Sequence, residues 1–426
     1  MALSTGKIAE VMFEKALDTH EHQMDMLDMV SFHQPDGGMM QNTGNYIWYP
    51  VEQHAPVISG WDLSGQETGI IEETYPALLG TPSNDYVKMR ADDMRTTRFW
   101  EDRGTESGKK QASTLNAAIA SAIAVQGSLF YRSNVTSGYE FIAEAQAIMN
   151  ERQLKTSQRY FMLNDRDTLL FSGDLAARQT LQGRPQETWK TGQIGQNIAE
   201  FDVYTGSFLP NITGAADPAV TITPNCAFVP VGGTVNATTG VVTNVDYREA
   251  TMITNNSALM AVGDKFTLQN TAVNVNAVGL SDKTNTGQAM TWTVVGIPAG
   301  GLNIEVYPKP IAADQAGITA LQAAYANIDT AILAAATVTR LNIDATNKTN
   351  LFWDKSAVEV IGGTIPAELF KQFDGMKVIT DTMSNGLNLY LVYDGNIDTM
   401  TFRFRLFTWY GVTIKNPSNC GCCVTF

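Results

Sequence analysis

Residues 46–75 constrain the fold of this chain more than any other stretch. They are rich in aromatic and apolar side chains, but prolines and glycines interrupt them at Pro50, Pro56, Gly60, Gly65 and Gly69. Proline removes a hydrogen-bond donor from a β-ladder and glycine weakens a strand, so the stretch cannot form a central strand. It predicts two short extended arms, residues 47–53 and 67–75, joined by a tip that carries Trp61 and Asp62.

Such a ribbon needs a surface to lie on, because an isolated two-stranded hairpin is only marginally stable in water. Without that surface, Trp48, Tyr49 and Trp61 leave large rings exposed to solvent. Either the ribbon packs on its own domain, or a neighbouring subunit supplies the surface. The residues of the ribbon leave both arrangements open.

The ribbon resembles a segment of one family of phage proteins. The matching residues are Ile47, Trp48, Pro50, Val51, Glu52, Gln53, Pro56 and Gly60-Trp61-Asp62-Leu63. They are similar to the extended loop, or E-loop, of major capsid proteins from short-tailed, lederbergvirus-type bacteriophages, which lies across an adjacent subunit. The resemblance therefore implies contacts between subunits through Trp48, Glu52, Trp61 and Asp62.

The same resemblance implies a fold class and a domain order. The family has an α+β architecture, the Hong Kong 97-type phage coat fold, with an inserted β-barrel domain. Its parts correspond here to an N-terminal arm (1–33), the E-loop (45–80), a peripheral (P) domain with a spine helix (81–135 and 385–426), an axial (A) domain (136–212 and 326–384) and an insertion (I) domain (213–325).

Composition agrees with a large, acidic assembly protein. The 426 residues carry a formal net charge of −14, and a length prior of about 100–200 residues per domain suggests two to four domains. An acidic chain is a poor ligand for phosphate backbones, so packaged DNA would slide past a wall made of it. No apolar run reaches the ~18 residues of a membrane-spanning helix, and the amphipathic, acidic N-terminus does not resemble a signal peptide.

Residues 4–30 predict an amphipathic helix. Glu10, Glu14 and Asp18 recur every four residues and therefore lie on one acidic face. This face is either solvated or a docking strip for a basic partner. In the resembling family the arm engages the scaffolding protein through carboxylates, which implies that role for these three residues. His20 and His22 are a weak metal signal, since positions two apart do not share a helix face.

Residues 109–130 form the strongest helical pattern in the chain, and the helix either starts there or begins earlier, near Thr97. The segment is rich in alanine, which has the highest helix propensity. It matches the spine helix of the resembling family. Further helices are expected at 138–155 and 169–182, and a strand at 159–163.

Charged residues alternate with apolar ones on two further strands. Residues 86–90 predict a short strand that leads into Arg90, Asp92, Asp93 and Arg95; these four are expected to form a local ion network, with a metal site as the alternative. Residues 400–407 predict a strand with Arg403 and Arg405 on one face, which is either solvated or paired with acids of a neighbour. Residues 409–412 are expected to close that sheet.

From about residue 213 the composition changes. Between Thr213 and Pro310 only ten residues are Asp, Glu, Lys or Arg. Short alternating segments separated by turn residues predict a small β-barrel or sandwich. The loop 232–240 carries no charge, whereas the corresponding loop of the resembling family is rich in aspartate, so any salt bridge made there is in doubt. Helical spacing returns at Leu321, Tyr325, Ile328 and Ile332.

The four cysteines carry no recognisable metal pattern. Cys226 stands alone, and Cys420, Cys422 and Cys423 form a cluster near the C-terminus. A zinc site usually needs two separated pairs. The cluster predicts reduced thiols on a mobile tail, with a metal site or a disulfide between subunits as alternatives.

No enzyme signature is present. The sequence has neither a phosphate-binding loop with Gly-Lys-Ser/Thr nor a Gly-x-Ser-x-Gly motif. We therefore expect a structural protein rather than an enzyme, with no cofactor and no metal.

The resemblance implies a major capsid protein. With scaffolding protein it would assemble in the bacterial host cytoplasm into hexamers and pentamers of an icosahedral virion shell. That shell has a portal at one vertex, encloses double-stranded DNA and matures by expansion, without a membrane. The alternatives are an encapsulin-like compartment shell and another β-rich virion protein, such as a tail or decoration subunit.

Overall fold

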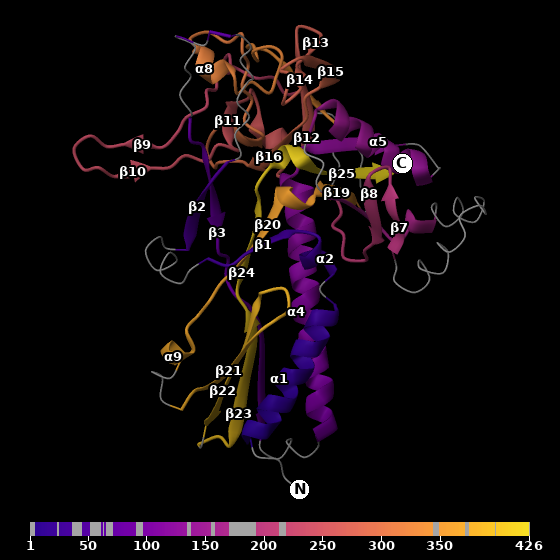
Figure 1. The fold of residues 1–426 in the computed structure, drawn as a ribbon, viewed down its shortest axis with the longest axis vertical. Coiled ribbons are helices and arrows are strands. Elements are labelled where there is room, and N and C mark those ends of the chain that lie inside the picture. The colour runs from indigo at the N-terminus through magenta and orange to yellow at the C-terminus, as the bar shows by residue number, and fades with distance from the viewer. Residues whose placement is uncertain are drawn as a thin grey trace. The chain divides into compact units, whose positions relative to one another are not determined.

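The computed structural model places the chain in two compact units (Figure 1). It describes residues 5–23, 25–35, 45–51, 61–62, 64, 71–90, 97–133, 138–154, 158–169, 193–212, 219–343, 349–370, 375–396 and 398–425. Unit 1 comprises Met1–Ile47, Ala77–Ile119 and Glu359–Thr413, and unit 2 comprises Trp48–Pro76, Ala120–Val358 and Ile414–Phe426. Among the described residues, no helix is both long and apolar enough to cross a bilayer.

Two long helices pack together in unit 1. Helix α1 (Thr5–His22) precedes the short α2 (Asp25–Asp28), and α4 spans Thr97–Gln126. Helix α4 therefore begins at Thr97 despite Gly104 and Gly108. Both glycines lie against α1, where a Cβ on Gly104 would come within 2.4 Å of the backbone oxygen of Met12. The two helices approach closely because these positions have no side chain.

A four-stranded antiparallel sheet forms the other layer of unit 1. Its strands are β21 (Lys377–Thr382), β22 (Asn388–Asn396), β23 (Thr401–Thr408) and β4 (Ser83–Arg90), in that order. On one face, Phe404 packs against Trp100 of α4. The opposite face carries Tyr86 beside Arg405 and Lys88 beside Arg403 in the strand register. The alternation predicted for residues 86–90 and 400–407 is confirmed.

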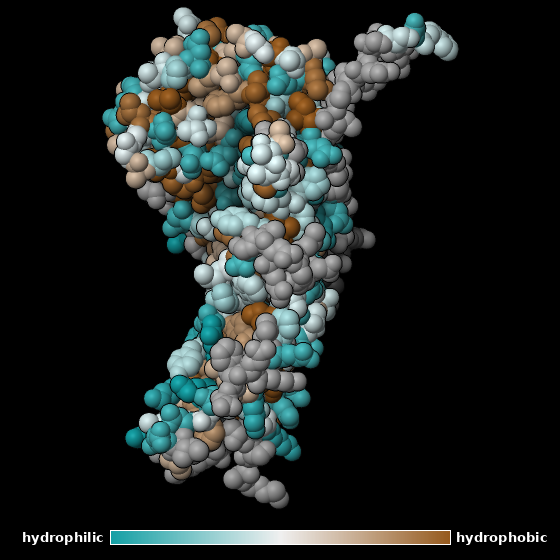
Figure 2. All heavy atoms as spheres, turned by 90° about the vertical axis from the view of Figure 1, so that its left-hand side faces the viewer, coloured by the Kyte–Doolittle hydropathy of each residue, from teal (hydrophilic) through white to brown (hydrophobic). Residues whose placement is uncertain are grey.

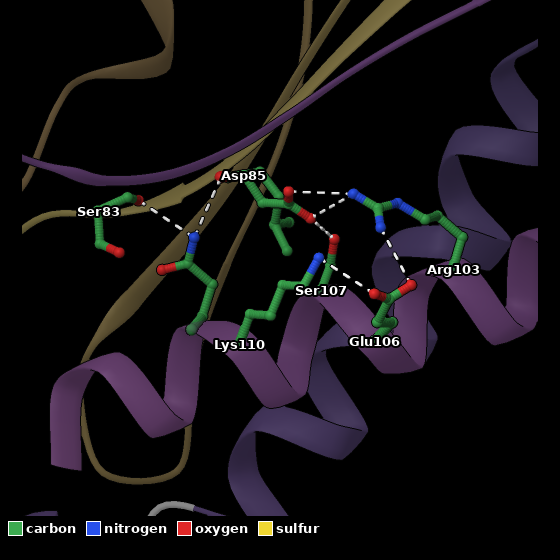
Figure 3. A network of polar contacts seen from close by, with 8 residues as sticks. Ser83, Asp85, Arg103, Glu106, Ser107 and Lys110 are labelled. Carbon is green, nitrogen blue, oxygen red and sulfur yellow. Dashed lines mark hydrogen bonds and ion pairs between the residues drawn. The ribbon is translucent and has the colours of Figure 1, made fainter. Parts of the chain in front are cut away.

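A polar network joins β4 to α4 (Figure 3). The guanidinium of Arg103 donates to both carboxylate oxygens of Asp85, at 3.0 and 2.9 Å, and Ser107 donates to the same carboxylate. Glu106 accepts from Arg103 and Lys110 along the helix, each at 3.1 Å. The network satisfies a carboxylate on the face of the sheet that the helix covers.

A three-stranded sheet completes unit 1. It consists of β1 (Ser31–His33), β20 (Val358–Gly362) and β24 (Tyr410–Ile414), in that order. Strand β24 pairs here and not with β23, so the expectation that residues 409–412 close the sheet of residues 400–407 is wrong. A short helix, α9 (Ala367–Phe370), follows β20.

Unit 2 contains a six-stranded mixed sheet covered by one helix. Its strands, in spatial order, are β5 (Leu129–Ser133), β25 (Cys420–Thr425), β19 (Asn350–Asp354), β6 (Arg159–Leu163), β8 (Phe201–Thr205) and β7 (Gln193–Ile198). Helix α5 (Gly138–Glu151) packs Phe141, Ala145 and Met149 onto this sheet. Residues 170–182, where another helix is expected, lie outside the described residues.

The C-terminal cysteines belong to this sheet and not to a mobile tail, so that prediction is wrong. Strand β25 pairs with β5 on one side and β19 on the other. Cys420, Cys422 and Cys423 are fully buried, free thiols, and burial raises the pKa of Cys420 to about 12. The prediction failed because the partner strands come from residues 129–133 and 350–354, far away in the sequence.

Residues 219–343 form a second layer of unit 2 with a core of its own. Its main strands are β11 (Ala250–Ile253), β17 (Asn303–Tyr307), β16 (Trp292–Gly296), β12 (Lys265–Asn270) and β13 (Val273–Asn274), with β18 (Thr337–Arg340) also paired to β12. Two small hairpins complete it: β9 (Thr234–Val235) with β10 (Val242–Thr243), and β14 (Asn276–Val278) with β15 (Asn285–Ala289). These named strands alone do not close into a ring.

The helical spacing at residues 321–332 corresponds to very little helix. Helix α8 covers only Ala320–Ala323. Ile328 and Ile332 form isolated β-bridges and are buried in the same core as Phe266 and Trp292. The expectation of a helix there is therefore wrong. The segment is largely irregular, and its regularly spaced apolar side chains fill this core without forming a helix.

A buried lysine joins this segment to the end of α4 within unit 2. The ammonium of Lys265 donates to the backbone oxygens of Val125 and Gly127, and to the hydroxyl of Thr293 at 2.9 Å. The last carbonyls of a helix have no partner inside the helix and carry partial negative charge. Lys265 satisfies them although its side chain is fully buried.

Candidate assembly surfaces

The acidic face of α1 is exposed, as the helical spacing predicts. Glu10, Glu14 and Asp18 are all exposed, while Met12 and Ala16 on the opposite side are buried. Asp18 lies 3.5 Å from the imidazole of His22. The face is therefore a row of carboxylates in water, which suits either solvation or contact with a basic partner.

His20 has no metal-binding geometry. Its ring is fully buried, and neither nitrogen has a hydrogen-bond partner within the described part of the chain. Burial lowers the pKa of His20 to about 4, so the ring is neutral at pH 7. Within the described residues no cluster of three or more His, Cys, Asp or Glu side chains is arranged to hold a metal ion.

The root of the ribbon is a two-stranded sheet of β2 (Tyr46–Pro50) and β3 (Thr74–Leu78). The amide of Val51 donates to the backbone oxygen of Glu73 at 2.8 Å, and the rings of Tyr49 and Tyr75 stand 5.7 Å apart. Trp48 is half-buried. Glu52 lies outside the described residues.

The tip of the ribbon leaves its tryptophan in solvent. Trp61 is 107% exposed, the highest value among the exposed large hydrophobic side chains. Asp62 accepts hydrogen bonds from the hydroxyl and the amide of Ser64, and these lower the pKa of its carboxyl. The chain thus presents a large indole ring beside a carboxylate that stays ionised.

Arg248, which lies in the turn 245–248, holds the root of the ribbon against that turn. Its guanidinium lies 5.3 Å from the ring centre of Tyr75 and 5.4 Å from that of Tyr307, and it donates to the backbone oxygens of Pro76 and Ile414. Asp246 accepts from it at 3.0 and 2.9 Å. Cation–π contacts of a desolvated arginine are worth ~2 kcal/mol or more, so this cluster holds the root of the ribbon in place.

The outer face of the four-stranded sheet contains a groove of about 460 Å³. Its lining is mainly apolar and also carries two arginines and one aspartate; it includes Pro82, Tyr86, Ile365, Phe370, Val392, Asp394, Arg403, Arg405 and Phe407. In Figure 2 the lower part, which carries this sheet, is mainly hydrophilic with small apolar areas between. Aromatic side chains of a binding partner commonly insert into apolar pockets of this kind, with charged residues at the edge.

The two arginines of the groove differ in their partners. Arg403 forms an ion pair with Asp394 of the same sheet. Arg405 donates to the side-chain oxygen of Asn84 at 2.7 Å and lies over the ring of Phe407, but has no acidic partner among the described residues. Arg90 is exposed at the end of β4, and Asp92, Asp93 and Arg95 lie outside the described residues.

The uncharged loop 232–240 is organised by its own polar side chains. Asn236 accepts hydrogen bonds from the amides of Thr238 and Thr239, at 2.9 and 3.1 Å, and Gly240 adopts a φ of 68°. Asparagine and glycine favour this kind of turn. The hairpin is thus held by local hydrogen bonds rather than by ion pairs.

Comparison with known proteins identifies the family. The family described as "P22 coat protein - gene protein 5" matches residues 1–425. Among solved structures, one titled "Mycobacterium phage Che8" is 10% identical with a TM-score of 0.42, covering 93% of this chain and 89% of that one. "Capsid structure of the Cyanophage P-SCSP1u" is 10% identical with a TM-score of 0.42, covering 93% and 86%.

A third solved structure, a virus-like particle from Pyrococcus furiosus, is 7% identical with a TM-score of 0.38, covering 97% and 98%. Because the family match spans almost the whole chain, the chain belongs to the P22 coat protein family and is a bacteriophage capsid protein.

Proposed function

We propose that this protein is the major capsid subunit of a short-tailed phage. With scaffolding protein it forms hexamers and pentamers of an icosahedral shell that encloses double-stranded DNA and expands on maturation. Assembly takes place in the host cytoplasm around a portal at one vertex. The observation that carries this proposal is the full exposure of Trp61 at the tip of the ribbon 45–80. The root of the same ribbon is held by Arg248.

The ribbon and the groove are complementary, which supports an E-loop role. Residues 45–80 contain no lysine or arginine, and their acids include Glu52, Asp62 and Glu67. The groove offers an apolar lining with Arg403 and Arg405. We infer that the tip of one subunit docks into the groove of a neighbour, with Trp61 in the hollow and Asp62 facing Arg405. Large aromatic side chains bury ~150–250 Å² and dominate interface energetics.

We propose that residues 219–343 are the insertion domain and that they form a β-barrel. Residues 220–223 supply the support. The amide of Thr223 donates to Ile253 oxygen at 2.9 Å, and the amide of Asn255 donates to Thr221 oxygen at 2.9 Å. On the other side, the amide of Ile222 donates to Ala336 oxygen and that of Val338 to Val220 oxygen, at 2.9 and 3.0 Å. These bonds join β11 to β18, the two elements that the named strands leave apart.

We propose the remaining domains with limits that differ from those expected from the sequence. We assign the helix pair and the two sheets of unit 1 to the N-terminal arm and the P-domain. The six-stranded sheet with α5 is assigned to the A-domain. Because β25 is a strand of that sheet, residues 420–425 go with the A-domain, although the sequence suggested the P-domain.

Assembly of the purified chain with its scaffolding protein tests the function. We expect closed, uniform particles by negative-stain microscopy. Particles recovered from infected cells should contain DNA and a single portal vertex. Particles from infected cells that lack DNA and a portal would favour the compartment-shell alternative, and soluble oligomers of the purified chain that never close would reject a shell function.

A further inference from the structure

A small cavity lies beside the root of the ribbon, entirely within unit 2. It has a volume of about 80 Å³. The ribbon contributes Val51 and Glu73 to its wall. The rest of the lining comes from the turns around Tyr247 and Lys283, from Lys309 and Tyr325, and from residues 415–418. A cavity that holds one water needs only ~10–15 Å³, so this one has room for a ligand larger than a single water molecule.

The lining of this cavity is rich in positive charge. Lys283, Lys309 and Lys415 all line it, and Lys309 is only 8% exposed. Arg248 also contributes, but Asp246 already neutralises it at 2.9 Å. Burial lowers the pKa of Lys283 and of Lys309, and for Lys309 it outweighs the opposing effect of Glu73 and Asp246. Lost hydration of both ammonium groups is therefore only partly compensated.

Glu73, the acid on this wall, supplies only part of that compensation. It is 3% exposed, and its Oε1 has no hydrogen-bond partner among the residues that the structure describes. Burial raises the pKa of Glu73 to about 8, although Lys309 opposes the shift. The carboxyl is therefore mainly protonated at pH 7 and offers an O–H donor in place of a negative charge. The lining of the cavity thus contains three lysines, of which Lys283 donates to the backbone oxygen of Ala326 at 3.3 Å, and one neutral carboxyl donor.

We propose that this cavity binds one small tetrahedral oxyanion of the phosphate class. Such an anion accepts hydrogen bonds on all its oxygens, which matches a wall of donors, and its charge compensates the buried lysines. Oxyanion binding would link the Glu73 arm of the ribbon to the 283 turn and to residues 415–418. It would therefore stiffen the root of the ribbon independently of what the tip contacts.

Direct binding of inorganic phosphate to the full-length purified chain tests the proposal. Phosphate also stabilises folded proteins non-specifically by exclusion from their surfaces. Isothermal titration at constant ionic strength is therefore the suitable measurement, with chloride as the reference anion. We expect saturable binding of one phosphate per chain at pH 7, weakening as the pH rises through 8 and Glu73 ionises.

Two variants locate the site. Lys309→Gln is expected to weaken phosphate binding about tenfold or more, since a hydrogen bond to a charged group is worth ~1.5–3 kcal/mol. The matched control is Lys109→Gln on the exposed surface of α4, which should bind as the parent chain does. Circular dichroism checks the fold, and Lys283→Gln replaces Lys309→Gln if the latter misfolds. Absence of saturable binding to the parent chain, or equal loss in the control, would overturn the proposal.

Discussion

Gly108 of α4 lies directly against the backbone of Ala16 in α1, and a Cβ at Gly108 would stand 2.5 Å from the Ala16 oxygen. Contacts below about 3.0 Å are essentially never seen for a real Cβ, so at least one of the two helices must shift if this glycine gains a side chain. The glycines that weaken the first half of α4 by propensity are the residues that allow α1 to pack there.

Gly108→Ala tests this packing. On an exposed helix the change would stabilise by ~0.5–1 kcal/mol; here we expect a destabilisation of ~1–3 kcal/mol from overpacking. Urea unfolding measures it. Gly6→Ala in α1 is the matched control, because its Cβ would find only the hydroxyl of Tyr393 at 3.9 Å. Equal effects of the two substitutions would contradict the close approach.

Replacing Arg248 by Met is expected to destabilise the chain by up to ~3–5 kcal/mol, because the half-buried Asp246 then loses its ion-pair partner. Only a small loss is expected for the exposed Arg98→Met. Adding Asp246→Asn to Arg248→Met should recover part of the stability, since it removes the orphaned charge. Urea unfolding of the four chains checks this, and no recovery in the double variant would argue against the ion pair.

Glu73 makes stability depend on pH in a defined direction. Its carboxyl has a pKa of about 8 in the folded chain, against the ordinary glutamate value of 4.5 that applies to the unfolded chain. The folded state therefore holds a proton that the unfolded state releases, and stability falls as the pH rises between about 4.5 and 8. Glu73→Gln should flatten this decline. The variant should therefore be more stable than the parent chain at pH 8, and the difference should vanish near pH 4. Parallel pH profiles of the parent and the variant would refute the assignment.

The acidic face of α1 predicts a charge-dependent interaction with scaffolding protein. Glu14→Lys combined with Asp18→Lys is expected to weaken co-sedimentation with scaffold, and the loss should be largest at low salt because exposed charges are screened. The control pair is Glu140→Lys with Asp165→Lys, which makes the same change in net charge elsewhere. Unchanged binding of the first pair, or equal loss in both, would reject this face as the docking strip.

Local patterns predicted the elements whose formation depends on neighbouring residues in the sequence. The helix predicted at residues 138–155 corresponds to α5, and the short alternating segments predicted after residue 213 include β12. Local patterns could not predict which distant segments pair with each other in a sheet. In the sequence, β25 resembles an unstructured cysteine-rich tail. It is a strand because it pairs with residues 129–133 and 350–354, which are far away in the sequence.

The same limit applies to the candidate sites. Glu10, Glu14 and Asp18 share a face through helical spacing alone, so the sequence predicted their arrangement. The groove draws on Pro82, Phe370 and Phe407, which no local pattern connects. Glu73 reads as one of several acids in the ribbon, and its burial depends on segments around residues 247, 283 and 309. Only the folded chain brings these together.

The assembly yield of Trp61→Ala tests the central claim most directly. The side chain is fully exposed in the single chain, so its removal should leave circular dichroism and urea unfolding of the monomer unchanged. Particle formation with scaffold should fall severely, whereas the matched exposed aromatic substitution Tyr139→Ala should assemble normally. Normal assembly of Trp61→Ala, or loss of monomer folding, would contradict a ribbon that docks on a neighbouring subunit.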